Sequence, residues 1–90
     1  MDPWQFRFSR TADEDLLCLD TGVRDRIIEK LKWFAGHFDS VLPLPLGEPW
    51  NGFFKLRAGD WRIVYTVERA IRQIIVHRID RRDKIYKRHA

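Results

Sequence analysis

The sequence predicts a two-layer α+β fold in which a helical hairpin packs on one face of a small, mostly antiparallel sheet. Three observations support this prediction. One strand-like segment precedes two segments with helical periodicity, three strand-like segments follow a proline-rich connection, and 44% of the 90 residues are hydrophobic, enough for one core. We therefore expect residues 1–90 to form a single domain with the order strand, helix, helix, three strands and a short basic tail.

The N-terminal segment alternates apolar and polar residues, as a half-buried strand does. Its apolar positions are Trp4, Phe6 and Phe8. A short helix is expected from Thr11 to about Leu19, with Thr11 as the N-cap and Glu14 closing a capping box. The acidic residues Asp13, Glu14 and Asp15 also favour the positive end of a helix dipole.

Asp20, Thr21 and Gly22 interrupt the first helix. A second helix is expected to follow, with Thr21 as its N-cap. Apolar residues recur on one side of this helix at helical spacing. They are Val23, Ile27, Leu31, Phe34 and Phe38. Because only a tight connection separates the two helices, we expect an antiparallel helical hairpin.

Residues 40–51 connect the helices to the rest of the sheet and are rich in residues that break regular structure. These are Pro43, Pro45, Gly47 and Pro49. They exclude a regular helix and a central strand. Leu42, Leu44 and Leu46 alternate along the connection, so we expect one side of it to pack against the core.

Residues 53–67, FFKLRAGDWRIVYTV, form two strand-like runs joined by a turn at Gly59 and Asp60. A third strand is expected over residues 71–79, after a turn near Arg69. This third strand is apolar on both sides, so it should be central in the sheet. His77 lies on it and is expected to be a packed histidine.

Charge is distributed unevenly along the chain, whose net charge is +4. Residues 1–52 hold six Lys or Arg and nine Asp or Glu, whereas residues 53–90 hold eleven and four. The C-terminal half is thus basic, which favours a polyanionic partner such as a nucleic acid. A solvated cationic sheet face explains the same charge distribution without any ligand.

The basic residues are expected to gather on the face of the sheet that the helices do not cover. If the apolar residues of the strand around Arg62 face the helices, alternation directs Arg62 away from them. The same rule applies to the neighbouring strand, and the tail can return to the edge of this face. The residues expected there are Lys55, Arg57, Arg62, one of Arg81 and Arg82, and Tyr86.

Such a cluster suits phosphoryl transfer on RNA. Arginine binds phosphate oxygens bidentately, cations offset the charge of a pentacoordinate phosphorus, and a lysine crowded by cations can act as a base. A tyrosine can stack on a base or position the ribose. We expect no metal and no other cofactor, because the histidines lie in different elements without a spaced set of carboxylates. These histidines are His37, His77 and His89.

The same residues carry a family resemblance that extends over nearly the whole chain. Leu46-Gly47 followed by Gly52 to Tyr65, GFFKLRAGDWRIVY, resembles the signature of the RelE/ParE toxin superfamily. Arg82 to Arg88, RDKIYKR, resembles its closing motif. The resemblance implies the toxin of a type II toxin–antitoxin pair. RelE-like members are ribosome-dependent endoribonucleases that cut mRNA and leave a 2′,3′-cyclic phosphate, whereas ParE-like members inhibit DNA gyrase.

The resemblance to RelE-like nucleases also implies roles for individual residues. Arg62 would contact the scissile phosphate, Lys55 would act as a base or stabilise charge, and Arg82 would assist the leaving group. Tyr86 would orient the nucleotide. The neighbouring cations would bind RNA; they are Arg57, Arg81, Lys84 and Lys87.

Three functional hypotheses follow from this resemblance. An mRNA endoribonuclease is favoured by Lys55, Arg82 and Tyr86, and a gyrase inhibitor is the alternative. Phe53 replaces a second lysine of the best-studied nuclease pattern, and Leu46 replaces an arginine. These two departures motivate the third hypothesis, a non-toxic chain retained as an antitoxin-binding module.

The implied partners are a cognate antitoxin, the ribosome and mRNA. No apolar run approaches the roughly 18–20 residues that a membrane helix needs, and the N-terminus lacks the features of a signal peptide. Cys18 is the single cysteine, which excludes an internal disulfide and favours a reducing compartment. We therefore expect no membrane partner and a cytoplasmic location.

Overall fold

Two α-helices, two short 3₁₀ helices and five strands lie within residues 3–84, the part of the chain that the computed structural model describes. In chain order they are β1 (Gln5–Phe8), α1 (Arg10–Leu17), α2 (Thr21–Gly36), η1 (Phe38–Ser40), β2 (Leu44–Pro45), β3 (Phe54–Ala58), β4 (Trp61–Glu68), η2 (Arg69–Ile71) and β5 (Gln73–Arg81). The strands form one sheet in the order β1-β5-β4-β3-β2.

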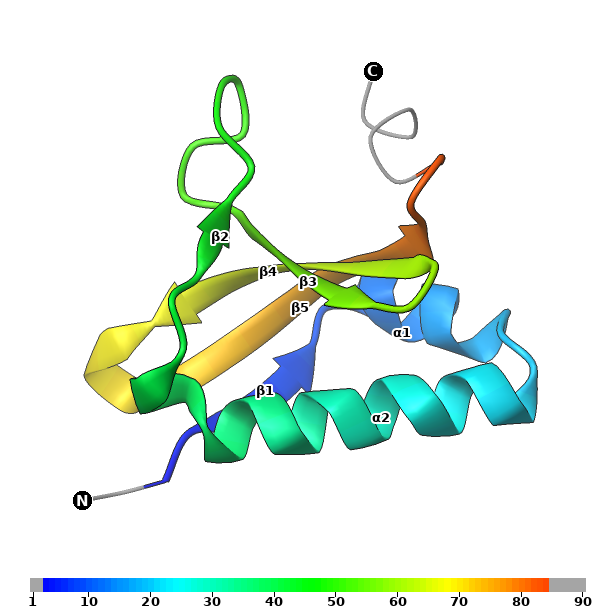
Figure 1. Ribbon diagram of the computed structural model, residues 1–90, viewed down its shortest axis with the longest axis horizontal. Coiled ribbons are helices and arrows are strands. Elements are labelled where there is room, and N and C mark those ends of the chain that lie inside the picture. The colour runs from blue at the N-terminus through cyan, green and yellow to red at the C-terminus, as the bar shows by residue number, and fades with distance from the viewer. Residues whose placement is uncertain (1–2, 85–90) are drawn as a thin grey trace.

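The sheet is mostly antiparallel, because only β1 and β5 pair in parallel among the described strands. Both helices lie on the same face of this sheet, and α2 runs along the full width of that layer (Figure 1). The predicted two-layer α+β fold is therefore confirmed. The sequence pattern missed the two-residue strand β2, which adds a short outer edge beside β3.

The core between the layers combines one side of α2 with the helix-facing residues of β4 and β5. Its fully buried large side chains are Tyr65, Ile27, Leu31, Ile63, Ile74, Ile79 and Val76. The helical spacing of apolar residues thus marked the buried side of α2 correctly. β5 is buried on both sides and lies inside the sheet, as its apolar composition predicted.

Both helices begin at a different cap from the one that the sequence predicted. Ser9 Oγ accepts the N–H of Ala12 at 3.2 Å, and Asp20 Oδ1 accepts the N–H of Val23 at 2.9 Å. Thr11 and Thr21 therefore lie inside their helices. The backbone N–H of Ser9 still donates to the carbonyl of Val76 in the sheet at 2.9 Å. The strand and the first helix therefore meet at Ser9.

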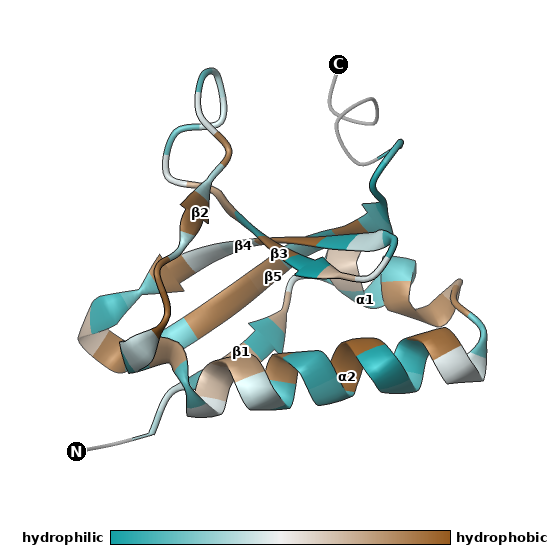
Figure 2. Ribbon diagram, viewed as in Figure 1, coloured by the Kyte–Doolittle hydropathy of each residue, from teal (hydrophilic) through white to brown (hydrophobic). Residues whose placement is uncertain are grey.

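Two of the three leucines of the connection before β3 do not pack against the core as expected, whereas Leu46 is half-buried. Leu42 is 87% exposed and Leu44 is 43% exposed. Leu44 is the first residue of β2 and Leu42 lies just before it, at the outer edge of the sheet. Figure 2 shows this apolar segment at the edge.

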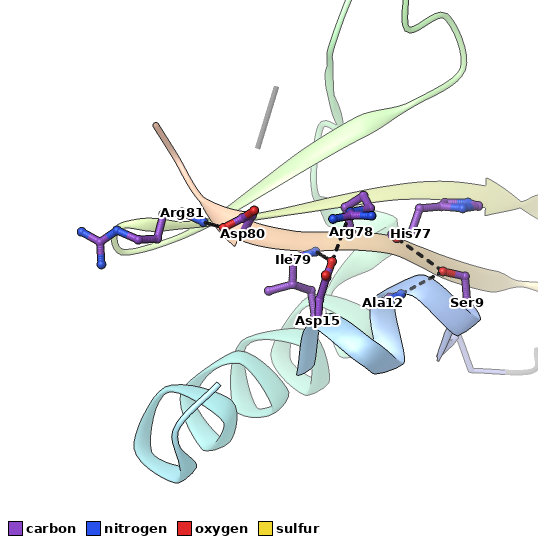
Figure 3. A network of polar contacts seen from close by, with 8 residues as sticks. All are labelled: Ser9, Ala12, Asp15, His77, Arg78, Ile79, Asp80 and Arg81. Atoms are coloured by element: carbon purple, nitrogen blue, oxygen red, sulfur yellow. Dashed lines mark hydrogen bonds and ion pairs between the residues drawn. The ribbon is translucent and has the colours of Figure 1, made fainter. Parts of the chain in front are cut away.

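β5 contains a bulge that alters which residues face the helices. Val64 pairs with Arg78, but the next residue, Tyr65, pairs with Val76, so His77 is the extra residue. His77 and Arg78 consequently both lie on the side of β5 away from α1 (Figure 3). The strand also starts at Gln73 rather than at residue 71, because η2 occupies the turn before it.

Helix α1 completes the edge of β5 where β1 ends. Ser9 Oγ donates to the carbonyl of His77 at 3.4 Å, and Asp15 Oδ2 accepts the N–H of Ile79 at 2.9 Å (Figure 3). The Asp15 carboxylate also lies 3.2 Å from Arg78 Nε. Asp15 is thus buried against the sheet. The sequence predicted only an interaction of this residue with the helix dipole.

Candidate nucleic-acid interface

The face of the sheet opposite the helices carries the predicted cations of β3 and β4; we call it the open face. Lys55 pairs with Val64, and Arg57 pairs with Arg62, in the antiparallel register. The alternate residues Leu56 and Ile63 pack into the core under the helices. The structure therefore brings Lys55, Arg57 and Arg62 together on the open face, as alternation predicted.

Arg57 and Arg62 lie directly opposite each other in this register. Like charges in that position destabilise a sheet unless something offsets them. Part of the offset is local, because Arg62 Nη1 donates to the carbonyls of Gly59 at 2.8 Å and Trp61 at 2.9 Å. The other nitrogens of Arg62 bond no described residue, so they can bind an anion.

The turn between β3 and β4 links the C-terminal segment to this cluster. Gly59 has a φ of +62°, a conformation that favours glycine, and its carbonyl holds Arg62. The neighbouring carbonyl, that of Asp60, accepts the backbone N–H of Arg82 at 2.9 Å. One turn thus positions Arg62 by its side chain and Arg82 by its backbone.

The remaining predicted residues of the tail are placed differently. Arg81 pairs with Trp61 and lies 5.9 Å from the centre of its ring, on the helix side of the sheet. Of the two arginines considered for the open face, Arg81 thus lies on the other side, and Arg82 is held beside the β3–β4 turn by its backbone N–H. Lys84 is exposed in the turn after β5, and Tyr86 and Lys87 lie outside the described residues.

Three further side chains lie on the open face but were not predicted as site residues: Asp80, His77 and Phe53. Asp80 pairs with Arg62 in the register of β4 and β5. His77 Nε2 lies 2.7 Å from Thr66 Oγ1, and its ring centre lies 5.3 Å from that of Phe53. The position of His77 could not be predicted from alternation, because the bulge in β5 interrupts the period of two. The position of Asp80 would follow from alternation once the register of β4 and β5 is known.

Burial affects the protonation of one residue of this group. It lowers the pKa of His77, and the positive charge of Arg7 lowers that pKa further. His77 is therefore mostly neutral near pH 7, and its ring is held as an aromatic group rather than as another cation.

A second surface lies between α2 and the outer edge of β3; we call it the edge groove. It contains two cavities of about 430 and 220 Å³, and both are lined by Lys30 and Arg57. The smaller cavity is also lined by Leu42, Leu44 and Trp33, of which Trp33 is 48% exposed. The smaller cavity is thus apolar with basic margins, whereas the larger one has a mixed lining that includes Arg26 and Asp60.

Neither a metal cluster nor a membrane helix was found in the described part of the chain. No group of three or more His, Cys, Asp and Glu residues within 3–84 could hold a metal ion. None of the helices in this range is long and apolar enough to span a bilayer.

Comparison with known proteins relates this chain to a family of toxins. The model of the ParE toxin of type II toxin–antitoxin systems matches residues 6–86. Toxin RelG of Mycobacterium tuberculosis is 31% identical over 90 residues, covering 96% of this chain and 99% of that protein.

Solved structures of related toxins have the same fold. The toxin–antitoxin complex RelBE2 from Mycobacterium tuberculosis matches with a TM-score of 0.80 and 25% identity, covering 90% of this chain and 100% of the matched chain. A mutant of E. coli toxin RelE in the free state matches with a TM-score of 0.75 and 19% identity, covering 98% and 93%. The chain therefore belongs to the RelE/ParE family and is a toxin of a type II toxin–antitoxin system.

Proposed function

We propose that this toxin is a ribosome-dependent, metal-free endoribonuclease that cleaves mRNA through a ribose 2′-hydroxyl and so inhibits translation in the cytoplasm. The observation that carries this proposal is the arrangement of cations around the β3–β4 turn. That turn holds Arg62 by its side chain and Arg82 by its backbone. Lys55 and Arg57 lie beside them on the open face.

The proposed reaction uses these residues to stabilise charge and move protons. The 2′-hydroxyl loses its proton to a base and attacks the adjacent phosphorus, a 2′,3′-cyclic phosphate forms, and the 5′-oxygen leaves with a proton. Arg62 would bind the phosphate oxygens, where its guanidinium offsets the charge that develops. Lys55 would serve as the base or stabilise charge, Arg82 would assist the leaving group, and Tyr86 would orient the nucleotide.

Mapping of mRNA 5′ ends after brief induction tests this proposal. We expect the wild-type chain to create new ends within translated messages and Arg62→Ala to create few or none. Arg10→Ala is the matched control, because the side chain of Arg10 is 94% exposed on α1, outside the open face. It should cleave like the wild type. An unchanged cleavage pattern in Arg62→Ala would contradict the proposed role of the open face.

A gyrase inhibitor is the second candidate, and the ParE description of the matching family model favours it. Induction would then trigger a DNA damage response and supercoiling defects, without new mRNA ends. If neither effect occurs, the chain is a non-toxic antitoxin-binding module. The same induction experiment therefore separates the three functions.

We further propose that a cognate antitoxin covers the edge groove with a segment of apolar and acidic side chains. Lys30 and Arg57 supply complementary charge, and the exposed rings and leucines supply apolar area. The matched RelBE2 structure is a toxin–antitoxin complex. Co-purification of the toxin with the product of a neighbouring gene would test the existence of such a partner.

A further inference from the structure

Two aromatic rings lie on the open face beside the cations and have no role in the proposed reaction. Phe53 directly precedes β3 and lies two residues from Lys55, on the same side of the chain. The ring of His77 meets it from β5, with centres 5.3 Å apart and planes at 65°. Both rings are half-buried, so each retains a surface that a ligand can reach.

The surrounding structure holds the ring of His77 and the backbone of Phe53 in place. His77 is the extra residue of the bulge, and its Nε2 lies 2.7 Å from Thr66 Oγ1. Two hydrogen bonds hold the backbone of Phe53: its N–H donates to the carbonyl of Trp50 at 3.1 Å, and its carbonyl accepts the N–H of Leu46 at 3.0 Å. Rings that are held before binding lose little conformational entropy when a ligand stacks on them.

The rings belong to an apolar patch within a face that is otherwise polar and cationic. Val64 and Ile75 lie on the open face, yet they are only 4% and 8% exposed. His77, mostly neutral near pH 7 because burial lowers its pKa, adds an uncharged ring to this patch. The patch therefore suits an uncharged planar group better than a phosphate.

We propose that Phe53 and His77 form a stacking platform for one unpaired nucleobase, next to the site where Lys55 and Arg62 bind the RNA backbone. This inference rests on the proposed function of the toxin. Single-stranded RNA is commonly bound by aromatic rings that stack on bases, combined with cations that follow the backbone. Phe53 and Lys55 lie about 7 Å apart along the strand, within the reach of neighbouring groups of one nucleotide.

The departure of Phe53 from the lysine of the nuclease pattern then has a physical meaning. A lysine at this position would contact phosphate and carry no preference among bases. An aromatic ring replaces that contact with stacking, which depends on the presence of a base.

Binding to RNA that lacks a single base tests the platform. Ribosomes are programmed with an mRNA whose open codon is intact or has one abasic nucleotide, and 2′-O-methyl groups block cleavage. We expect the wild type to bind the abasic mRNA about 10-fold more weakly at one codon position, within the range that one stacked base contributes. In Phe53→Leu this difference should shrink below about 2-fold, and His77→Leu should reduce it in the same direction.

Two further variants separate stacking from a structural role. Phe53→Trp keeps an aromatic ring and should retain the abasic difference. Ile71→Ala, at a 61% exposed residue of η2 outside the platform, should also retain it. A purely structural role of Phe53 would weaken binding to both mRNAs equally and leave the difference unchanged, which would overturn the platform.

Cleavage of unmodified mRNA by the wild type separates this failure from failure of the proposed function. If the wild type cleaves but the abasic difference persists in Phe53→Leu, only the platform is wrong. If the wild type neither binds the programmed ribosomes nor cleaves mRNA, the platform and the endoribonuclease proposal are both wrong.

Discussion

The carboxylate of Asp15 accepts the backbone N–H of Ile79 at 2.9 Å, so a helix side chain completes the edge of a strand. The strand β1 ends at Phe8 and leaves the last part of β5 without a neighbour on that side. Asp15 occupies this edge and also pairs with the largely buried Arg78. An unpaired strand edge invites association with other chains, so this contact protects as well as stabilises the sheet.

Replacing Asp15 with alanine should lower the free energy of unfolding by about 3 kcal/mol, because it leaves a buried N–H and a buried guanidinium without this carboxylate. Urea denaturation measures the loss. Asp13→Ala, at an exposed acidic residue of the same helix, should cost less than about 1 kcal/mol. Equal effects of the two substitutions would show that the edge contact contributes little.

Replacing Arg62 with lysine keeps the charge but removes the planar fork that binds two phosphate oxygens at once. We expect cleavage of ribosome-bound mRNA to fall about 10- to 100-fold, with thermal stability nearly unchanged because Arg62 is partly exposed. Single-turnover rates and melting temperatures measure the two effects. Wild-type rates in this variant would mean that Arg62 provides only charge.

Tyr65 should make stability depend on pH in alkaline solution. Burial raises the pKa of its hydroxyl to about 12, from the ordinary value of 10.0. Above pH 10 the unfolded chain loses this proton while the native chain keeps it, so the stability from Tyr65 falls as the pH rises from about 10 to about 12.

Tyr65→Phe should remove the part of the stability loss in alkaline solution that is due to the Tyr65 hydroxyl. At neutral pH it should change the unfolding free energy by less than about 1 kcal/mol or raise it slightly, because the buried hydroxyl has no hydrogen-bond partner among the described residues. Denaturation of both proteins from pH 7 to 11 compares them. Parallel curves over that range would contradict the raised pKa of Tyr65.

Asp39 should contribute to stability in acid. The hydrogen bond from the Trp4 indole lowers the pKa of Asp39 below its ordinary value of 3.8, and Arg72 lowers it further. The contribution is complete above the ordinary value and is lost as the pH falls through the lower pKa of the native state. Asp39→Asn should therefore lose less stability than the wild type between pH 4 and pH 2, as thermal melts would show.

Trp33 should matter for the antitoxin and not for catalysis. A negative charge in the edge groove would repel acidic side chains of the antitoxin, and the loss of the Trp33 ring would remove apolar contact area. Trp33→Asp should therefore weaken antitoxin binding about 10-fold or more. Isothermal titration with the co-purified antitoxin measures this effect. Cleavage by the free toxin should persist, since Trp33 lies on the helix side of the sheet; loss of both activities would indicate misfolding instead.

The periodicity of the sequence was sufficient for the fold and for three residues of the site. The alternation around Arg62 and the helical repeat through Leu31 are local consequences of burying one side of each element. Side-chain direction along an unbroken strand follows from its period of two. That is why Lys55, Arg57 and Arg62 could be assigned to the open face.

The tertiary structure decided what depends on contacts between distant segments. The bulge at His77, the backbone hydrogen bond from Ser9 to Val76 and the edge contact of Asp15 each join residues whose separation along the chain has no periodic signal. The same holds for Arg82, which reaches the site through the carbonyl of Asp60 while its neighbour Arg81 turns to the other side. Alternation is local and predicts faces; register, bulges and edges depend on how strands meet, which only the folded chain determines.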